Sequence, residues 1–315
     1  QIRFIFASQS PHMENILLIF TCICIGLALR RLPTLPANAH VALNHFVIYI
    51  SLPALALYYI PKIEISTQLL YPVGVAWLGF GLSFLFFTLL RKYFNWSKKL
   101  TGSLILTAGL GNTAFLGYPI AEALYGGEGL QLAILVDQPG SSIVISTLGI
   151  LVATSQSRGT TSGSQMLIKV LSFPPFVAFV IALVLNLTGT DFPELTQAVF
   201  SKLGSTVTPV ALTSVGLQLK WEQHSKHWNF LAIGLAFKLL IYPLFFLILY
   251  HFIFGAEALI VQVSVMQAAM APMITAAILA SSYGLKPKLS NMMIGIGIPL
   301  SFLTLSLWYW VLSLL

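Results

Sequence analysis

The sequence predicts an all-α integral membrane protein with ten transmembrane helices in two inverted five-helix repeats. Three features predict this class: an apolar composition, ten long apolar runs, and prolines at matching places in the two halves. Of the 315 residues, 57% are hydrophobic and 8% are charged, whereas a soluble domain has about 25% charged residues. The chain therefore has no room for a sizeable soluble domain.

Ten apolar runs follow one another along the chain, each near the length of about 20 residues that crosses the hydrocarbon core of a bilayer. They are 14–32, 42–61, 69–91, 101–125, 129–154, 168–188, 197–218, 229–254, 257–283 and 290–314. The seventh is the least hydrophobic, so we expect it to face protein or water along one side.

The ten runs divide into two halves. We predict a first five-span repeat over 13–154, a short cytosolic linker over 155–167 and a second repeat over 168–315. We expect residues 1–12 to be a remnant of a cloning vector, because His12-Met13 is what a common cloning site leaves behind.

The basic residues alternate between connections, which predicts the orientation. Lysine and arginine accumulate in the odd-numbered connections, and the even-numbered connections are neutral or acidic. The basic positions are Arg30, Arg31, Arg91, Lys92, Lys98, Lys99, Arg158, Lys169, Lys220, Lys226, Lys286 and Lys288. Because basic loops stay on the cytoplasmic side, we expect both termini outside, in a bacterial inner membrane.

Prolines within the spans repeat between the halves. The pairs are Pro53 with Pro209, Pro119 with Pro272, and Pro139 with Pro299. They fall in spans two and seven, four and nine, and five and ten. Because each half has five spans, the second half enters the membrane from the opposite side. The pattern therefore predicts an inverted repeat.

The fourth and ninth runs contain helix breakers. Gly117 and Pro119 follow a polar stretch in the fourth, and Pro272 interrupts the ninth. Lipid cannot satisfy free backbone groups, so a broken helix at that depth packs in protein or lines a cavity. We expect the two broken helices to cross at mid-membrane, where secondary carriers hold their substrates, with half-helix N-termini suited to a carboxylate.

These motifs resemble the auxin efflux carrier family, which includes the plant PIN-FORMED proteins and bacterial carboxylate carriers, and more distantly the bile acid:sodium symporters. The resemblance covers nearly the whole chain from Met13. It rests on Asn112-Thr113-x-x-x-Gly117-x-Pro119 with Tyr125-Gly126, on Ser51-Leu52-Pro53 and on Val136-Asp137-Gln138.

The resemblance implies a transport domain moving against a scaffold domain in an elevator-like way, with an organic anion as cargo. Two features depart from the family. The linker is short where many plant members carry a long cytosolic loop. The ninth span lacks a glycine-rich motif and an acidic residue, which disfavours a sodium site of the bile-acid type.

Five polar residues are candidates for binding the cargo. Asn112 matches the family motif and offers two donors and one acceptor; the alternative is a polar clamp between helices. The other candidates, from the second, fifth and ninth spans, are Ser51, Gln138, Ser141 and Gln267.

Three charged residues within the predicted spans are candidates for coupling transport to an ion. Asp137 is about 12 Å deep in span five, at 1.5 Å per residue, and an acidic group there is a functional hypothesis by default. It either binds a proton in each transport cycle or pairs with Lys238 of span eight. Glu122 could substitute in either role.

The sequence therefore predicts a secondary transporter for small organic anions, carboxylates and auxin-like compounds among them, with efflux as the expected direction. The alternatives are a sodium-coupled organic-anion importer and a non-transport sensor or channel. No nucleophile–base constellation or metal-ligand spacing appears in the spans, so we expect no enzyme activity, cofactor or metal. The expected partners are the anion, a proton or sodium ion, the bilayer and a second copy in a homodimer. The basic residues form no face that could follow nucleic acid.

Overall fold

The computed structural model describes residues 11–36, 38–157, 171–219 and 227–315. Over these residues the protein is helical, and its β pairing is limited to one isolated antiparallel bridge between Gly111 and Pro272. The predicted remnant up to residue 10, the linker beyond Ser157, the start of the sixth span, and Arg158, Lys169, Lys220 and Lys226 lie outside the described residues.

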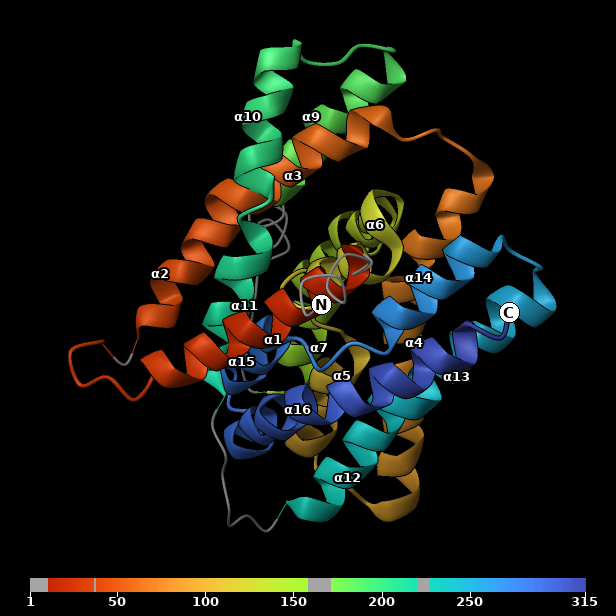
Figure 1. Ribbon diagram of the computed structural model, residues 1–315. Coiled ribbons are helices and arrows are strands. Elements are labelled where there is room, and N and C mark those ends of the chain that lie inside the picture. The colour runs from red at the N-terminus through yellow and green to blue at the C-terminus, as the bar shows by residue number, and fades with distance from the viewer. Residues whose placement is uncertain (1–10, 37, 158–170, 220–226) are drawn as a thin grey trace, which may run out of the picture.

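The helices of the first half are interrupted by short π and 3-10 turns (Figure 1). They are α1 (Pro11–Leu29), α2 (Ala39–Phe46), η2 (Val47–Ser51), α3 (Leu52–Tyr59), η3 (Ile60–Lys62), η4 (Thr67–Leu69), α4 (Leu70–Phe94), α5 (Lys98–Gly109), α6 (Gly117–Val136), η5 (Asp137–Ser142), η6 (Ile145–Gly149) and α7 (Ile150–Gln156).

The second half has a similar series. Its helices are α9 (Pro174–Leu187), α10 (Glu194–Gly204), α11 (Val207–Gln218), α12 (Trp228–Ala236), η7 (Phe237–Ile241), α13 (Tyr242–Leu247), η8 (Ile248–Ile253), α14 (Ala258–Ala268), α15 (Ile274–Ser282) and α16 (Pro287–Leu312).

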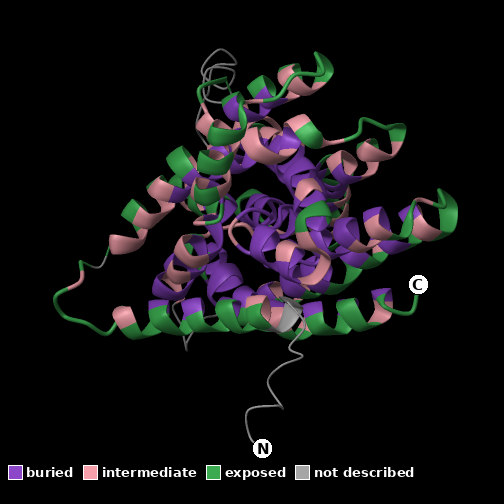
Figure 2. Cartoon of the chain, turned by 45° about the horizontal axis from the view of Figure 1, so that its top comes forward, coloured by how far each residue is buried: buried purple, intermediate pink, exposed green. Residues whose placement is uncertain are grey.

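Five helical stretches are long and apolar enough to cross a membrane, the third of them with a kink at Gly126: Ala39–Lys62, Thr67–Phe94, Gly117–Gln156, Trp228–Ile253 and Pro287–Leu312. Glu14–Leu29, Pro174–Leu187 and Ala258–Ala268 are apolar but shorter. Large apolar side chains such as Leu89, Phe252 and Leu303 remain exposed, and exposed residues cover the outside of a buried centre (Figure 2). The all-helical apolar class is therefore confirmed, and the ten-span inverted repeat stays a prediction.

One predicted helix boundary coincides with a kink and another predicted run is divided. The gap expected after residue 125 falls at Gly126, where two helical segments that together make up α6 meet at a non-helical backbone conformation. Gly126 has φ of 65°, a left-handed conformation that glycine adopts without steric cost.

The run predicted over 197–218 is not one helix, because it divides at Ser205 and Thr206 into α10 and α11. Both hydroxyl groups bond backward to the end of α10: Ser205 Oγ donates to Lys202 O at 2.8 Å and Thr206 Oγ1 donates to Leu203 O at 2.5 Å. Such bonds compete with the helical ladder, which accounts for the division.

Glycines bring α1 and α11 into close contact. A Cβ atom on Gly26 would lie 2.2 Å from Thr213 O, and one on Gly216 would lie 2.4 Å from Ile23 O. Small residues let helix backbones approach closely within a membrane. Elsewhere, α9 and α10 pack beside α3 (Figure 1).

Two buried apolar clusters hold the helices together. The larger includes residues of α1, α4, α5 and each helix from α12 to α16. The smaller joins α3, α9 and α11 to both ends of α6 and to α14. Helix α6 contributes to both clusters, so the interrupted segment before it is enclosed by packed helices.

Candidate functional site

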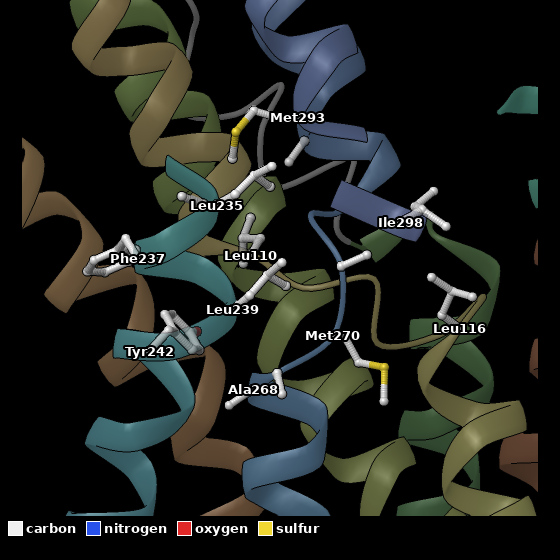
Figure 3. Close-up of a cluster of buried hydrophobic side chains, with 14 of the residues drawn as sticks. Leu110, Leu116, Leu235, Phe237, Leu239, Tyr242, Ala268, Met270, Met293 and Ile298 are labelled. Atoms are coloured by element: carbon white, nitrogen blue, oxygen red, sulfur yellow. The ribbon is translucent and has the colours of Figure 1, made fainter. Parts of the chain in front are cut away.

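The two helix interruptions lie against each other. Residues 110–116 connect α5 to α6, and residues 269–273 connect α14 to α15. Asn112 N donates to Ala271 O at 2.8 Å, and Met273 N donates to Leu110 O at 3.0 Å. Figure 3 shows the two extended stretches, one carrying Leu110 and Leu116 and the other Met270 beyond Ala268. Each break thus satisfies backbone groups of the other, as a buried interruption requires.

The residues that suit an interruption sit in and beside these segments. Pro272 has no N–H to donate, and it lies within the bridge beside Gly111. Gly117 is the first residue of α6, and Pro119 is the third. The break therefore begins earlier than Pro119 itself, whose position in the first turn is one that proline tolerates.

Two buried amides at the break lack hydrogen-bond partners. Asn112 is 3% exposed and Gln267 is 1% exposed, and Asn112 Nδ2, Gln267 Nε2 and Gln267 Oε1 bond to no described residue. The Gln267 amide lies over Gly117, because a Cβ there would be 2.2 Å from Gln267 Oε1. Unpaired polar groups next to the first turn of α6 are therefore available to a ligand.

A second polar cluster surrounds Asp137, which is 2% exposed. Its Oδ1 accepts from Thr113 Oγ1 at 2.6 Å, and its Oδ2 accepts from Tyr118 OH at 3.0 Å and from Gln138 Nε2 at 2.8 Å. Three donors suit an ionised carboxylate, which only accepts hydrogen bonds. The Thr113 hydroxyl also lies 3.2 Å from Ser141 Oγ, so it has a second acceptor available when the carboxyl group takes a proton.

The Asp137 cluster and the unpaired amides share one chain segment. Thr113 directly follows Asn112, and Tyr118 directly follows Gly117. Residues 112–118 therefore include or contact both the unpaired amides and the Asp137 carboxylate. Any shift of this segment changes both.

Lys238 is fully buried but does not pair with Asp137. Its Nζ donates to Ala268 O at 2.9 Å and lies 4.0 Å from the centre of the Tyr242 ring. The pair of Asp137 and Lys238 considered from the sequence is therefore absent from this conformation. The Lys238 ammonium contacts the end of α14, and the carboxylate accepts from Thr113, Tyr118 and Gln138.

Ser51 and Glu122 belong to different surroundings. Ser51 Oγ lies 2.7 Å from Thr206 Oγ1, so it joins η2 to the α10–α11 connection. Glu122 Oε2 accepts from Thr208 Oγ1 at 3.4 Å and lines a cavity of about 70 Å³ with residues of α3 and α10. Neither hydrogen bond leads to the Asp137 cluster.

Thr113, Tyr118 and Tyr242 were not among the residues expected at the site. Thr113 and Tyr118 could have been found, because both lie inside the motif that carries the family resemblance. Tyr242 follows Lys238 by four residues, the spacing that places two helical side chains together.

Comparisons with known proteins agree with the fold. A model of the family described as "Membrane transport protein" matches residues 11–309. An uncharacterized transporter of Methanocaldococcus jannaschii is 27% identical over 309 residues, which cover 95% of this chain and 98% of that protein. An uncharacterized transporter of Methanothermobacter thermautotrophicus is 29% identical over 304 residues, covering 95% and 98%. The apolar helices and the family match together show that this chain is an integral membrane transporter that belongs to the membrane transport protein family, the auxin efflux carriers.

Proposed function

We propose that this protein is a secondary carrier that exports small organic anions, carboxylates in particular, by elevator-like alternating access around the paired helix interruptions. The observation that carries the proposal is the unpartnered amides of Asn112 and Gln267 beside the first turn of α6. A buried donor or acceptor without a partner costs about 1–3 kcal/mol. A carboxylate that accepts from Asn112 Nδ2 and Gln267 Nε2 would remove that cost at the two amide nitrogens.

The charge of the helix end favours an anion over a neutral ligand. A helix N-terminus carries about half a positive charge. The first turn of α6, which starts at Gly117, is such an end, although its own N–H groups already donate to backbone carbonyl groups of residues 112–116. A carboxylate at this point gains both the helix field and the side-chain amides.

Coupling to protons follows from the position of Asp137. The carboxylate is buried and holds Thr113 and Tyr118, which flank the residues proposed to bind the anion. Protonation would release one of these bonds and allow residues 112–118 to rearrange. Cargo binding and proton binding would then depend on the same segment.

Counterflow in proteoliposomes tests the function and the amide site together. We expect one or more members of a carboxylate panel to exchange, and Asn112→Ala to weaken their binding. Loss of a charge-assisted hydrogen bond costs about 1.5–3 kcal/mol, or roughly tenfold to more than hundredfold in affinity at about 1.4 kcal/mol per decade.

The matched control is Asn186→Ala. The two N–H groups of the Asn186 amide already have acceptors, with Ile60 O, Pro61 O and Ile63 O at 2.7–3.0 Å from Nδ2, so its loss should lower stability without changing cargo affinity. An Asn112→Ala protein with wild-type affinity would remove Asn112 from the site. Failure of every carboxylate in the panel would reject the anion proposal.

The proposal includes ten spans in two inverted repeats, with both termini outside a bacterial inner membrane. Single cysteines at Asp191 and Lys98, both exposed, should react with an impermeant reagent from opposite sides of intact cells. The background protein has Cys22 and Cys24 replaced by serine. Labelling of both sites from outside would contradict this topology.

A further inference from the structure

The carbonyl ends of both interrupted helices meet side chains from the same stretch of helix. Ala268, the last residue of α14, accepts from Lys238 Nζ at 2.9 Å. The carbonyl oxygen of Gly109, the last residue of α5, lies 3.2 Å from Tyr242 OH, whose one proton it shares with Val75 O at 3.1 Å. Figure 3 shows Tyr242 on the helix that faces Ala268. The Lys238 ammonium thus contacts the C-terminus of α14, and the Tyr242 hydroxyl, one turn further along the same helix, contacts the C-terminus of α5.

This arrangement has the electrostatic character of a cation site. A helix C-terminus carries about half a negative charge, so the two ends together balance about one positive charge. In sodium-coupled carriers, unwound carbonyls and half-helix C-termini of this kind coordinate the ion. Here the positive charge is already supplied by a side chain.

We propose that the Lys238 ammonium is a tethered cation that fills the seat a sodium ion would take at the ends of α5 and α14. Sodium is then not the ion that drives transport through this seat. The inference deepens the proposed carrier function, and its consequence for coupling rests on that function. Whether the Lys238 ammonium occupies this position does not depend on the carrier function.

The space and the contacts agree with a filled seat. Lys238 is 0% exposed, and a Cβ on Gly111 would lie 3.1 Å from its Nζ, so the ammonium lies directly against the break. The Tyr242 ring, 4.0 Å from Nζ, adds a cation–π contact. No carboxylate of the described residues pairs with this ammonium, which leaves the helix ends as its counter-charge.

Thermal unfolding of the purified protein in different salts tests the proposal without any transport assay. The wild-type protein should have the same Tm in NaCl and in choline chloride of equal ionic strength, within about 1 °C. In Lys238→Ser, the ammonium is replaced by a small group with an oxygen atom. Sodium should then enter, and Tm should rise by about 2–5 °C in NaCl over choline chloride, saturating with concentration.

Two variants serve as controls. Lys238→Met removes the charge but keeps the seat filled with apolar atoms, so it should show no sodium response. Lys202→Ser removes an exposed lysine and should behave as the wild type does. A general salt effect would raise Tm in all of these proteins alike.

Two results would overturn the proposal: a saturable sodium stabilisation of the wild-type protein, or a folded Lys238→Ser protein without one. If Lys238→Ser folds only when purified in NaCl and unfolds on exchange into choline chloride, this result also supports the proposal, because the variant then requires sodium to fold. Should it fold in neither salt, Lys238→Asn replaces it, and the wild-type measurement still decides whether the seat accepts sodium. Absence of carboxylate exchange would reject the carrier function and leave these Tm results unaffected.

Discussion

Asp137→Asn should abolish transport driven by a pH gradient while exchange of cargo for cargo continues. Asparagine imitates a permanently protonated carboxyl group, so the variant cannot release a proton and return empty. Exchange does not require the empty, deprotonated carrier. The pH-driven flux in proteoliposomes should therefore fall to that of liposomes without protein.

The contacts of Asp137 also predict the stability of this variant. Its carboxylate accepts from Thr113, Tyr118 and Gln138 and not from Lys238. If the two charges formed a structural pair, removing one would cost about 3–5 kcal/mol, and Lys238→Met would restore the loss. We expect no such restoration, because the two groups have separate partners.

Glu122→Gln is the matched control, since Glu122 is an acidic residue of α6 whose partner is Thr208 and not a member of the Asp137 cluster. This variant should keep its pH-driven transport. Wild-type pH-driven transport in Asp137→Asn would dismiss the proton role. Loss of coupling in Glu122→Gln alone would assign that role to Glu122.

Gly117→Ala should reduce cargo affinity by about a hundredfold or more, equivalent to about 2.7 kcal/mol or more. The added methyl group would lie 2.2 Å from Gln267 Oε1 and 2.8 Å from Gln267 Nε2. The flexible amide must move, so the fold survives with an overpacking cost of about 1–3 kcal/mol. The proposed anion site loses the Gln267 amide and part of its space beside α6.

A double-mutant cycle with Gln267→Ala separates stability from binding. Adding Gln267→Ala to Gly117→Ala removes the clash, so Tm should recover while cargo affinity stays low. Gly81→Ala is the control, because nothing lies within 4 Å of a Cβ at that exposed helical position. Full cargo affinity in Gly117→Ala would show that the anion does not bind beside the first turn of α6.

The sequence was sufficient to predict the class of protein and the places where two helices break. Apolar runs and the low proportion of charge depend only on composition, and a proline or glycine within a run interrupts the helix locally. Asn112, Gly117, Asp137 and Gln267 were found for the same reason: polar or flexible residues stand out within an apolar run.

The division of the seventh run into two helices was harder to predict from the sequence. A single serine or threonine in a membrane helix usually only bonds to the preceding turn, without ending the helix. At Ser205 and Thr206, two adjacent hydroxyl groups bond backward, and Thr206 also reaches Ser51. Ser51 and Thr206 are 155 residues apart in the sequence, so a local sequence pattern could not predict their contact.

Only the tertiary structure decided which polar groups act together. Thr113 reaches Asp137 across 24 residues, and Tyr242 reaches Gly109 across 133. Lys238 was equally compatible by depth with Asp137, but helix packing directs its Nζ to Ala268 O. A buried ammonium group needs hydrogen-bond acceptors, and a backbone carbonyl group can serve as one just as a carboxylate can. Its partner is therefore chosen by the direction of the side chain within the packed fold, which residue type and spacing do not specify.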